Sequence, residues 1–185
     1  MCIRDRTQGD LLEISLLLGS HMLLLAEKAK TLPEARAMLE NALSSGAGLR
    51  KLAEMIAAQG GDPRVVEDLS LLPQAEVKRV MRAEMAGYLS AMDTTALGMA
   101  AQRMGAGRAK KSDMLDYSVG YVLHVRLGDE VTEDTLLATL YARNEAEAEE
   151  AEKAIRKALT IAKEKPSVPP LWDAVVTAEG ITYNR

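Results

Sequence analysis

Over the first sixty or so positions, the apolar residues recur at the spacing of α-helices. From Leu11 to Leu25, leucine, isoleucine and methionine fill most positions. A helix that is apolar almost all round is typically buried against other elements. Asp10 can cap such a helix, with Glu13 three residues on, so we expect a buried helix from Asp10 to about Lys28.

Two further helices are predicted before residue 60. Thr31 and Glu34 have the spacing of a capping box, with Pro33 in the first turn, and Gly46 ends that helix. A third helix is expected over residues 47–59, where apolar positions again follow helical spacing. Three helices without a sheet of their own predict the remnant of a larger domain.

The pattern changes near Pro73, after which short extended segments alternate with helices. Strands are predicted over residues 76–85, 87–92, 121–126 and 136–141, the last two joined across Gly128-Asp129. Asp93 is expected to cap a short helix, and Asn144 to begin a long acidic helix that reaches about Ala162. The sequence therefore predicts an α+β fold.

Composition and charge narrow the classes of function. The net charge is −4 and the pI about 5.3, so no basic excess favours nucleic acid or an anionic membrane surface. The most apolar run, Leu16 to Ala26, falls short of the roughly 20 residues of a membrane helix. Cys2 is the sole cysteine, which excludes an internal disulfide and a thiolate zinc site. We expect a soluble, cytoplasmic protein.

Residues 1–6 do not continue into the pattern that follows. They have neither the apolar core of a signal peptide nor the look of a pro-segment. We interpret them as a non-native scar and expect the natural protein to be longer at its N-terminus.

Two glycine-containing segments resemble phosphate cradles. Ser44 to Gly48 precedes a helix, but it lacks the P-loop lysine and does not follow a strand, which favours a plain helix-to-helix turn. The loop from Gly105 carries three cations, Arg108, Lys110 and Lys111. A solvated surface loop is the favoured interpretation, and an anion-contacting loop remains the alternative.

No active site can be assembled from residue chemistry alone. His21 and His124 lack the spacing of a metal pair, and each is interpreted as a hydrogen-bonded core histidine. The acidic run over residues 145–152 is expected to be the solvated face of a helix. No nucleophile elbow is present.

Several segments taken together are more specific than any one of them. They are Leu18–Met22, Leu25–Ala29, Ala57–Asp62, Leu97–Gly98, Met104–Arg108, Val119–His124, Gly128–Asp129 and Leu137–Ala142. In this order and spacing the chain resembles the C-terminal part of bacterial pyrimidine-nucleoside and thymidine phosphorylases, from about Thr7 to Val176.

The resemblance implies a domain organisation. Residues 7–72 would be the last helices of a larger α/β domain of the glycosyltransferase type, and residues 76–176 the C-terminal domain of these phosphorylases. That domain would be a strand-rich, lipoyl-like barrel-sandwich with flanking helices. Residues 177–185 would be a tail.

The resemblance also implies a reaction, the reversible phosphorolysis of thymidine or uridine to the free base and a pentose 1-phosphate. Inorganic phosphate is then a co-substrate, and no cofactor or metal is expected. The family's phosphate and base ligands lie upstream, so no catalytic residue is carried over, and this chain alone is expected to be inactive without the missing N-terminal portion of a homodimeric parent. In relatives the loop matching Gly105 to Leu115 lies over the cleft, so Arg108, Lys110 and Lys111 are the candidate substrate-cleft residues.

Two non-catalytic alternatives remain. Gly128 to Val131 followed by Leu136 to Tyr141 is also typical of a biotinyl or lipoyl carrier. A carrier needs a lysine at a hairpin tip, whereas the corresponding segment here, Ala91 to Asp93, has none. The other alternative is a structural module that packs on a catalytic partner.

Overall fold

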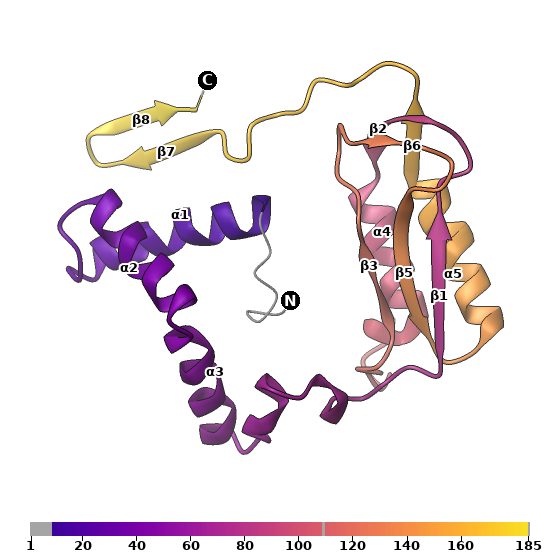
Figure 1. Cartoon of the computed structure of the whole chain (residues 1–185), viewed down its shortest axis with the longest axis horizontal. Coiled ribbons are helices and arrows are strands. Elements are labelled where there is room, and N and C mark those ends of the chain that lie inside the picture. Colours follow the sequence, from indigo (N-terminus) through magenta and orange to yellow (C-terminus); the bar gives the residue numbers. More distant parts are fainter. Residues whose placement is uncertain (1–8, 109, 185) are drawn as a thin grey trace. The chain divides into compact units, whose positions relative to one another are not determined.

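The computed structural model describes residues 9–108 and 110–184, so the predicted scar at residues 1–6 lies outside the described part. The chain divides into two compact units. One runs to Leu71 and includes the segment from Pro169, and the other comprises Leu72–Val168. Helices and strands are mixed in the way the α+β prediction requires (Figure 1).

The first unit contains α1 (Asp10–Leu25), α2 (Leu32–Ser44) and α3 (Ala47–Ala58), the 3-10 turns η1 (Pro63–Val66) and η2 (Leu69–Leu71), and the antiparallel pair β7 (Ala174–Thr177) and β8 (Gly180–Tyr183). The capping box of α2 is confirmed, because the Thr31 hydroxyl accepts a hydrogen bond from the Glu34 amide at 3.3 Å. The cap expected for α1 is wrong. Gly9 is its N-cap, and the Glu13 carboxylate instead accepts a bond of 2.9 Å from Arg36 of α2.

These helices bury few side chains within their own unit. α1 packs against α2, and α2 against α3, but α3 has no buried residue and α1 only Leu16 and Ser20. Leu18, Met22 and Leu25 are 57, 68 and 86% exposed. The apolar side chains of α1 are therefore largely exposed within this unit, as expected for an apolar helix whose covering elements lie outside the chain. The predicted end near Lys28 is wrong, because α1 ends at Leu25.

The second unit contains two small antiparallel sheets. One has the order β1 (Val77–Arg82), β5 (Leu136–Ala142), β3 (Gly120–Leu123), and the other the order β4 (Glu130–Val131), β2 (Gly87–Met92), β6 (Leu159–Ala162). The predicted strands are confirmed, with β4 inserted between the two that were expected to be joined directly. Across the described residues both sheets stay open, so the barrel-sandwich is not confirmed.

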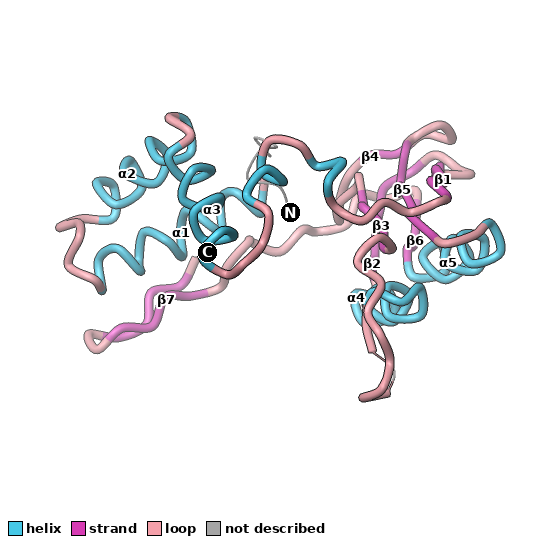
Figure 2. The backbone as a smooth tube through the Cα atoms, turned by 90° about the horizontal axis from the view of Figure 1, so that it is seen from below, coloured by secondary structure: helices cyan, strands magenta, loops and turns pink. Residues whose placement is uncertain are grey.

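Two helices cover the sheets of this unit. Asp93 caps α4 (Thr94–Ala101) by accepting from the Ala96 amide at 2.9 Å, and Asn144 caps α5 (Glu145–Ala158) by accepting from the Glu147 amide at 2.9 Å. Both predicted caps are confirmed. α5 packs on β5 and β1, and α4 packs on α5. Figure 2 shows the two helices on the same side of the strands.

The predicted end of the acidic helix at Ala162 is wrong. Residues 159–162 form β6, which pairs with β2 through partners such as Met92 and Leu159. Gly87 begins β2 at a point of close approach, where a Cβ would lie 2.5 Å from the Ala162 carbonyl oxygen. Glycine is therefore required where β2 meets β6.

A single apolar cluster holds the second unit together. Its largest fully buried side chains are Met81, Leu89, Val131, Leu137, Leu140 and Ile155. These side chains come from both sheets and from α5, so the cluster packs the two sheets and the helix against one another. Burying such side chains stabilises a fold by about 1.5–3 kcal/mol each.

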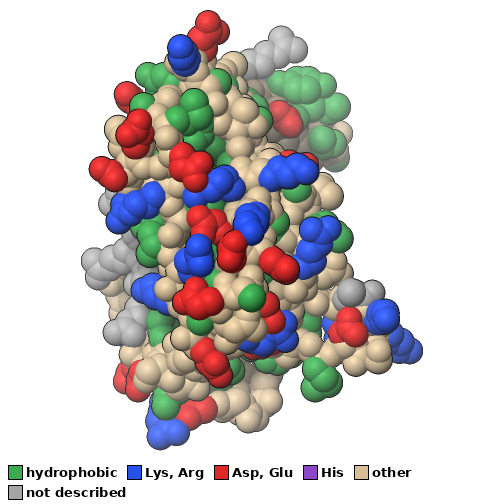
Figure 3. Space-filling model, turned by 90° about the vertical axis from the view of Figure 1, so that its right-hand side faces the viewer, with side chains coloured by type: hydrophobic (Ala, Val, Ile, Leu, Met, Phe, Trp, Pro, Cys, Tyr) green, Lys and Arg blue, Asp and Glu red, His purple; other side chains and the backbone are tan. Residues whose placement is uncertain are grey.

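Ion pairs tie α5 to the first sheet. Glu152 on α5 accepts hydrogen bonds from Arg79 of β1 at 2.7 Å and from Arg156 at 2.8 Å. Burial works against the charged carboxylate, but these two bonds outweigh it and hold the pKa of Glu152 below its usual value. Figure 3 shows acidic and basic side chains intermixed over this side of the molecule. The acidic run is thus largely solvated, as predicted, except at Glu152, whose side chain is only 18% exposed.

Candidate functional site

The three predicted cations lie on a loop that follows α4. The helix continues into a π-helical turn, η3 (Gln102–Ala106), within which Gly105 adopts a φ of 103°. That positive φ favours glycine and turns the chain out of the helix. The chain then returns, and the Asp116 amide donates a hydrogen bond of 3.0 Å to the Gly105 carbonyl. We call residues 105–116 the basic loop; its closely spaced ends are those of an Ω-loop.

The basic loop presents its cations to solvent. Arg108, Lys110 and Lys111 are all exposed. Within residues 9–108 and 110–184, no side-chain hydrogen bond or ion pair joins these three cations to another residue. Met114 in the same loop and Tyr117 just after it are 89 and 79% exposed. Positive charge beside exposed apolar surface is suited to contact an anion or another part of a protein.

The two ends of the basic loop, Gly105 and Asp116, form its stem. The stem is held by contacts that the sequence analysis missed. The Asp116 carboxylate accepts hydrogen bonds from the Ser118 hydroxyl at 2.6 Å and from the Ser118 amide at 2.9 Å. These bonds, with the positive charge of Arg143, lower the pKa of Asp116. Arg143 in turn donates to Glu147 at 2.9 Å. The Asp-x-Ser spacing, typical of an Asx turn, was the available signal in the sequence.

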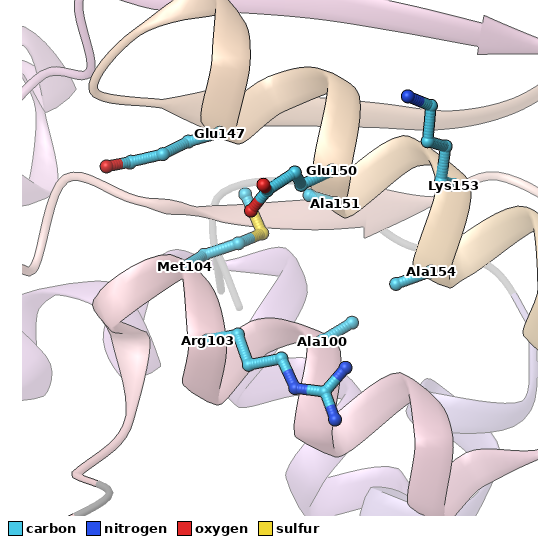
Figure 4. Close-up of a pocket in the computed structure, with 8 residues that line it drawn as sticks. All are labelled: Ala100, Arg103, Met104, Glu147, Glu150, Ala151, Lys153 and Ala154. Carbon is cyan, nitrogen blue, oxygen red and sulfur yellow. The ribbon is translucent and has the colours of Figure 1, made fainter.

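A shallow pocket of about 280 Å³ lies between α4 with η3 and α5 (Figure 4). Arg103 and Met104 line one side, and Glu147, Glu150 and Lys153 line the other. Two acidic and two basic side chains balance each other, so the pocket has no net attraction for an anion. We assign no ligand to it.

Comparison with known proteins places the second unit in a family. Residues 88–162, which contain the basic loop, match the family described as pyrimidine nucleoside phosphorylase C-terminal domain. Over 136 residues, the chain is 46% identical to the pyrimidine-nucleoside phosphorylase of Geobacillus stearothermophilus, covering 74% of this chain and 31% of that protein. Over 175 residues it is 39% identical to the enzyme of the same name from Staphylococcus aureus strain USA300, covering 95% and 40%.

The chain matches the C-terminal portion of the pyrimidine-nucleoside phosphorylases. It spans less than half the length of these two relatives. The resemblance found in the sequence segments is therefore confirmed.

The segment Ser44 to Gly48 is a turn between helices, as interpreted. The Ser45 hydroxyl donates to the Asn41 carbonyl at 2.6 Å, which closes the end of α2. Gly46 is the N-cap of α3. The hydroxyl is thus engaged by the backbone rather than directed at a ligand.

The two histidines differ from each other. His124 directly follows β3, and its Nε2 lies 2.9 Å from the Thr139 hydroxyl. It is hydrogen-bonded as predicted but exposed, so it is no core residue. The Nε2 of His21 is buried and has no hydrogen-bond partner among the described residues, so the interpretation of His21 as a hydrogen-bonded histidine is wrong.

The geometry gives no support to the carrier alternative. The turn between β2 and α4 is Asp93, which caps the helix, and no lysine occupies this turn. Among the described residues, no helix has both the length and the apolar character needed to cross a membrane.

Proposed function

We propose that this chain is the C-terminal portion of a cytoplasmic enzyme that catalyses reversible phosphorolysis of pyrimidine nucleosides. In that reaction the bond between the base and C1′ of the pentose breaks, and a phosphate oxygen bonds to C1′. The products are the free base and a pentose 1-phosphate. The names of the relatives and the family match of residues 88–162 support this proposal.

The chemistry of this reaction assigns most of the catalytic site to the rest of the enzyme. Breaking the glycosidic bond develops positive charge on the sugar and negative charge on the base, so the enzyme must hold phosphate beside the sugar and stabilise the base. No cluster of the required kind is found among residues 9–108 and 110–184 of this chain. We therefore propose that the chain alone is inactive. We also propose, from the resemblance alone, that the parent is a homodimer and that inorganic phosphate is its co-substrate.

The basic loop is the part of this chain that we propose to act near substrate. The observation that carries this role is the set of exposed, unpaired side chains of Arg108, Lys110 and Lys111 on a loop with a closed stem. Such cations can attract phosphate and cover a cleft when the enzyme closes, in the way lid loops do.

A fusion protein tests both assignments. The chain is joined to the portion of the Geobacillus stearothermophilus relative that precedes the matched region, and phosphate-dependent release of uracil or thymine is measured. We expect turnover from the fusion. Arg108→Ala, and Lys110→Ala with Lys111→Ala, should each raise KM for phosphate about tenfold, a loss typical of one charged contact.

Lys157→Ala is the matched control, because Lys157 is an exposed cation of α5 outside the loop. It should leave KM unchanged. A folded fusion without phosphorolysis would contradict the proposed reaction. An active fusion whose phosphate KM is unchanged by every loop substitution would contradict the role of the loop alone.

A further inference from the structure

We propose that Asp116 is a positioning residue, which closes the stem of the basic loop and thereby fixes where Arg108, Lys110 and Lys111 are presented. This inference rests on the proposed function of the loop. Asp116 itself is directed at the stem, where its contacts are all to residues of this chain.

The backbone and the side chain of Asp116 act on opposite sides of the stem. The amide donates to the Gly105 carbonyl at 3.0 Å and so joins the two ends of the loop. The carboxylate takes both bonds from Ser118, which orders the chain that leads into the buried Val119 and β3. One residue therefore links the end of η3 to the segment that leads into β3.

Three side chains lie around Gly105 in the stem. A Cβ built on Gly105 would lie 3.6 Å from the Asp116 Cβ, 3.7 Å from a Val119 methyl and 3.8 Å from the Arg143 Cζ. The guanidinium of Arg143 thus lies beside the stem, and its own bond to Glu147 fixes it to α5. The hydrogen bonds from Ser118 and the charge of Arg143 favour the ionised carboxylate and lower the pKa of Asp116, so the stem combines charge attraction with hydrogen bonds.

The tip of the loop, around residues 110–113, is held by fewer contacts than the stem. The Asp113 carboxylate accepts from the Lys110 amide at 2.8 Å, and the Asp113 amide donates to the Lys110 carbonyl at 3.0 Å. These contacts shape the tip locally. Arg108 has an anchor of its own, because the Gln102 side chain in η3 donates a hydrogen bond of 2.5 Å to the Arg108 carbonyl. The stem therefore acts together with Gln102 on Arg108, and Lys110 and Lys111 depend more on the stem.

Limited proteolysis of the 185-residue chain measures the stem directly. Trypsin cleaves after Arg108, Lys110 and Lys111, and its rate at these sites follows the population of the opened loop. We expect Asp116→Ala to raise the rate about tenfold, and Asp116→Asn and Ser118→Ala to raise it less, because each leaves part of the bonding in place. The cleavage rate at Arg36 or Lys51 in the first unit should not change.

Asp134→Asn is the matched control for charge removal. Asp134 is exposed and lies just before β5, whereas Arg143 lies just after it, at the other end of the strand. This variant should be cleaved at the wild-type rate. The melting temperature of each variant is measured alongside, and Asp116→Asn and Ser118→Ala keep the test valid if Asp116→Ala does not fold.

The positioning role of Asp116 is tested by measuring KM and kcat of the fusion enzyme. Asp116→Asn should raise KM for phosphate several-fold in the same direction as Arg108→Ala, while kcat at saturating phosphate changes little. A general loss of structure would instead lower the amount of active enzyme, and so lower kcat with KM unchanged.

The outcomes separate this inference from the function on which it rests. An unchanged rate of tryptic cleavage in the Asp116 and Ser118 variants would contradict the claim that Asp116 holds the stem closed. Increased cleavage with an unchanged phosphate KM would overturn the positioning role, provided Arg108→Ala still raises that KM. Increased cleavage together with an unchanged phosphate KM in Arg108→Ala would contradict the proposed function of the loop. The positioning role of Asp116, which rests on that function, would be contradicted as well.

Discussion

The two units of the chain bury their apolar residues to very different extents. In Leu72–Val168, both sheets and two helices share one continuous cluster that includes Met81, Leu140 and Ile155, each fully buried. In the helical unit Leu16 is the one large apolar side chain that is buried among the described residues, while others of α1 such as Met22 and Leu25 remain exposed.

This difference follows from how each unit covers the apolar faces of its helices and strands. A sheet face and a helix stripe can cover each other within one short segment, as β1, β5 and α5 do. A helix that is apolar all round needs partners on several sides, and α1 contacts mainly α2. The second unit therefore holds its own core, whereas the helices of the first leave large apolar side chains exposed.

Separating the two units should have the largest effect on association and on the cooperativity of unfolding. A chain of residues 72–168 is expected to be a monomer that unfolds cooperatively in urea, because its core is complete. The whole chain should form oligomers or aggregates through its exposed helices. Light scattering and sedimentation of both chains at equal concentration check this. A monomeric whole chain with a single cooperative transition would remove the contrast between the units.

A core truncation in the second unit should have the next largest effect. Leu140→Ala leaves a cavity at the centre of β5, where the side chain is fully buried. We expect a loss of about 3 kcal/mol in the free energy of unfolding of residues 72–168, measured in urea. A loss below about 1 kcal/mol would show that this core is loosely packed.

The ion pairs of Glu152 should contribute less, and in a pH-dependent way. Glu152→Gln is expected to cost residues 72–168 about 1.5 kcal/mol at pH 7, because bonds from Arg79 and Arg156 are weakened. The pKa of Glu152 is lowered in the folded state, so its contribution is complete above the usual value of 4.5 and is lost as the pH falls through the folded pKa. Unfolding curves from pH 7 to pH 3 should converge for the two proteins. A constant difference across that range would contradict this assignment.

The smallest effect on stability is expected on α1. Leu25→Ala removes a side chain that is 86% exposed, so the free energy of unfolding of the whole chain should change by less than about 0.5 kcal/mol. Association should nevertheless decrease, because the exposed apolar area is reduced. Sedimentation at several concentrations separates the two effects. A large loss of stability would mean that Leu25 is buried in solution.

Local signals in the sequence predicted most of the elements. Caps at Thr31, Asp93 and Asn144 act as their spacing indicates, since each side chain accepts a hydrogen bond from the backbone amide three residues on. The errors arise where distant residues decide the outcome. Residues 159–162 could have extended α5, but pairing with β2 makes them a strand. The hairpin of β7 and β8 likewise depends on a pairing that the sequence analysis did not foresee.

The candidate site was predictable only in part. Arg108, Lys110 and Lys111 were visible as a cluster of charge next to glycines. Their stem was not, because the bond from Asp116 to Gly105 spans the whole loop and Arg143 comes from beyond β5. The orphaned Nε2 of His21 was also missed, since a partner for a buried histidine cannot be found from helical spacing alone.

The most direct test of the whole account is the release of free thymine or uracil by the purified 185-residue chain, with and without phosphate. We predict no release from the chain alone, and phosphate-dependent release once the preceding portion of the Geobacillus stearothermophilus relative is added to the same preparation. Clear phosphate-dependent release by the chain alone would contradict the account. It would place the reaction within these residues, with Arg108, Lys110, Lys111 and His124 as the first to substitute.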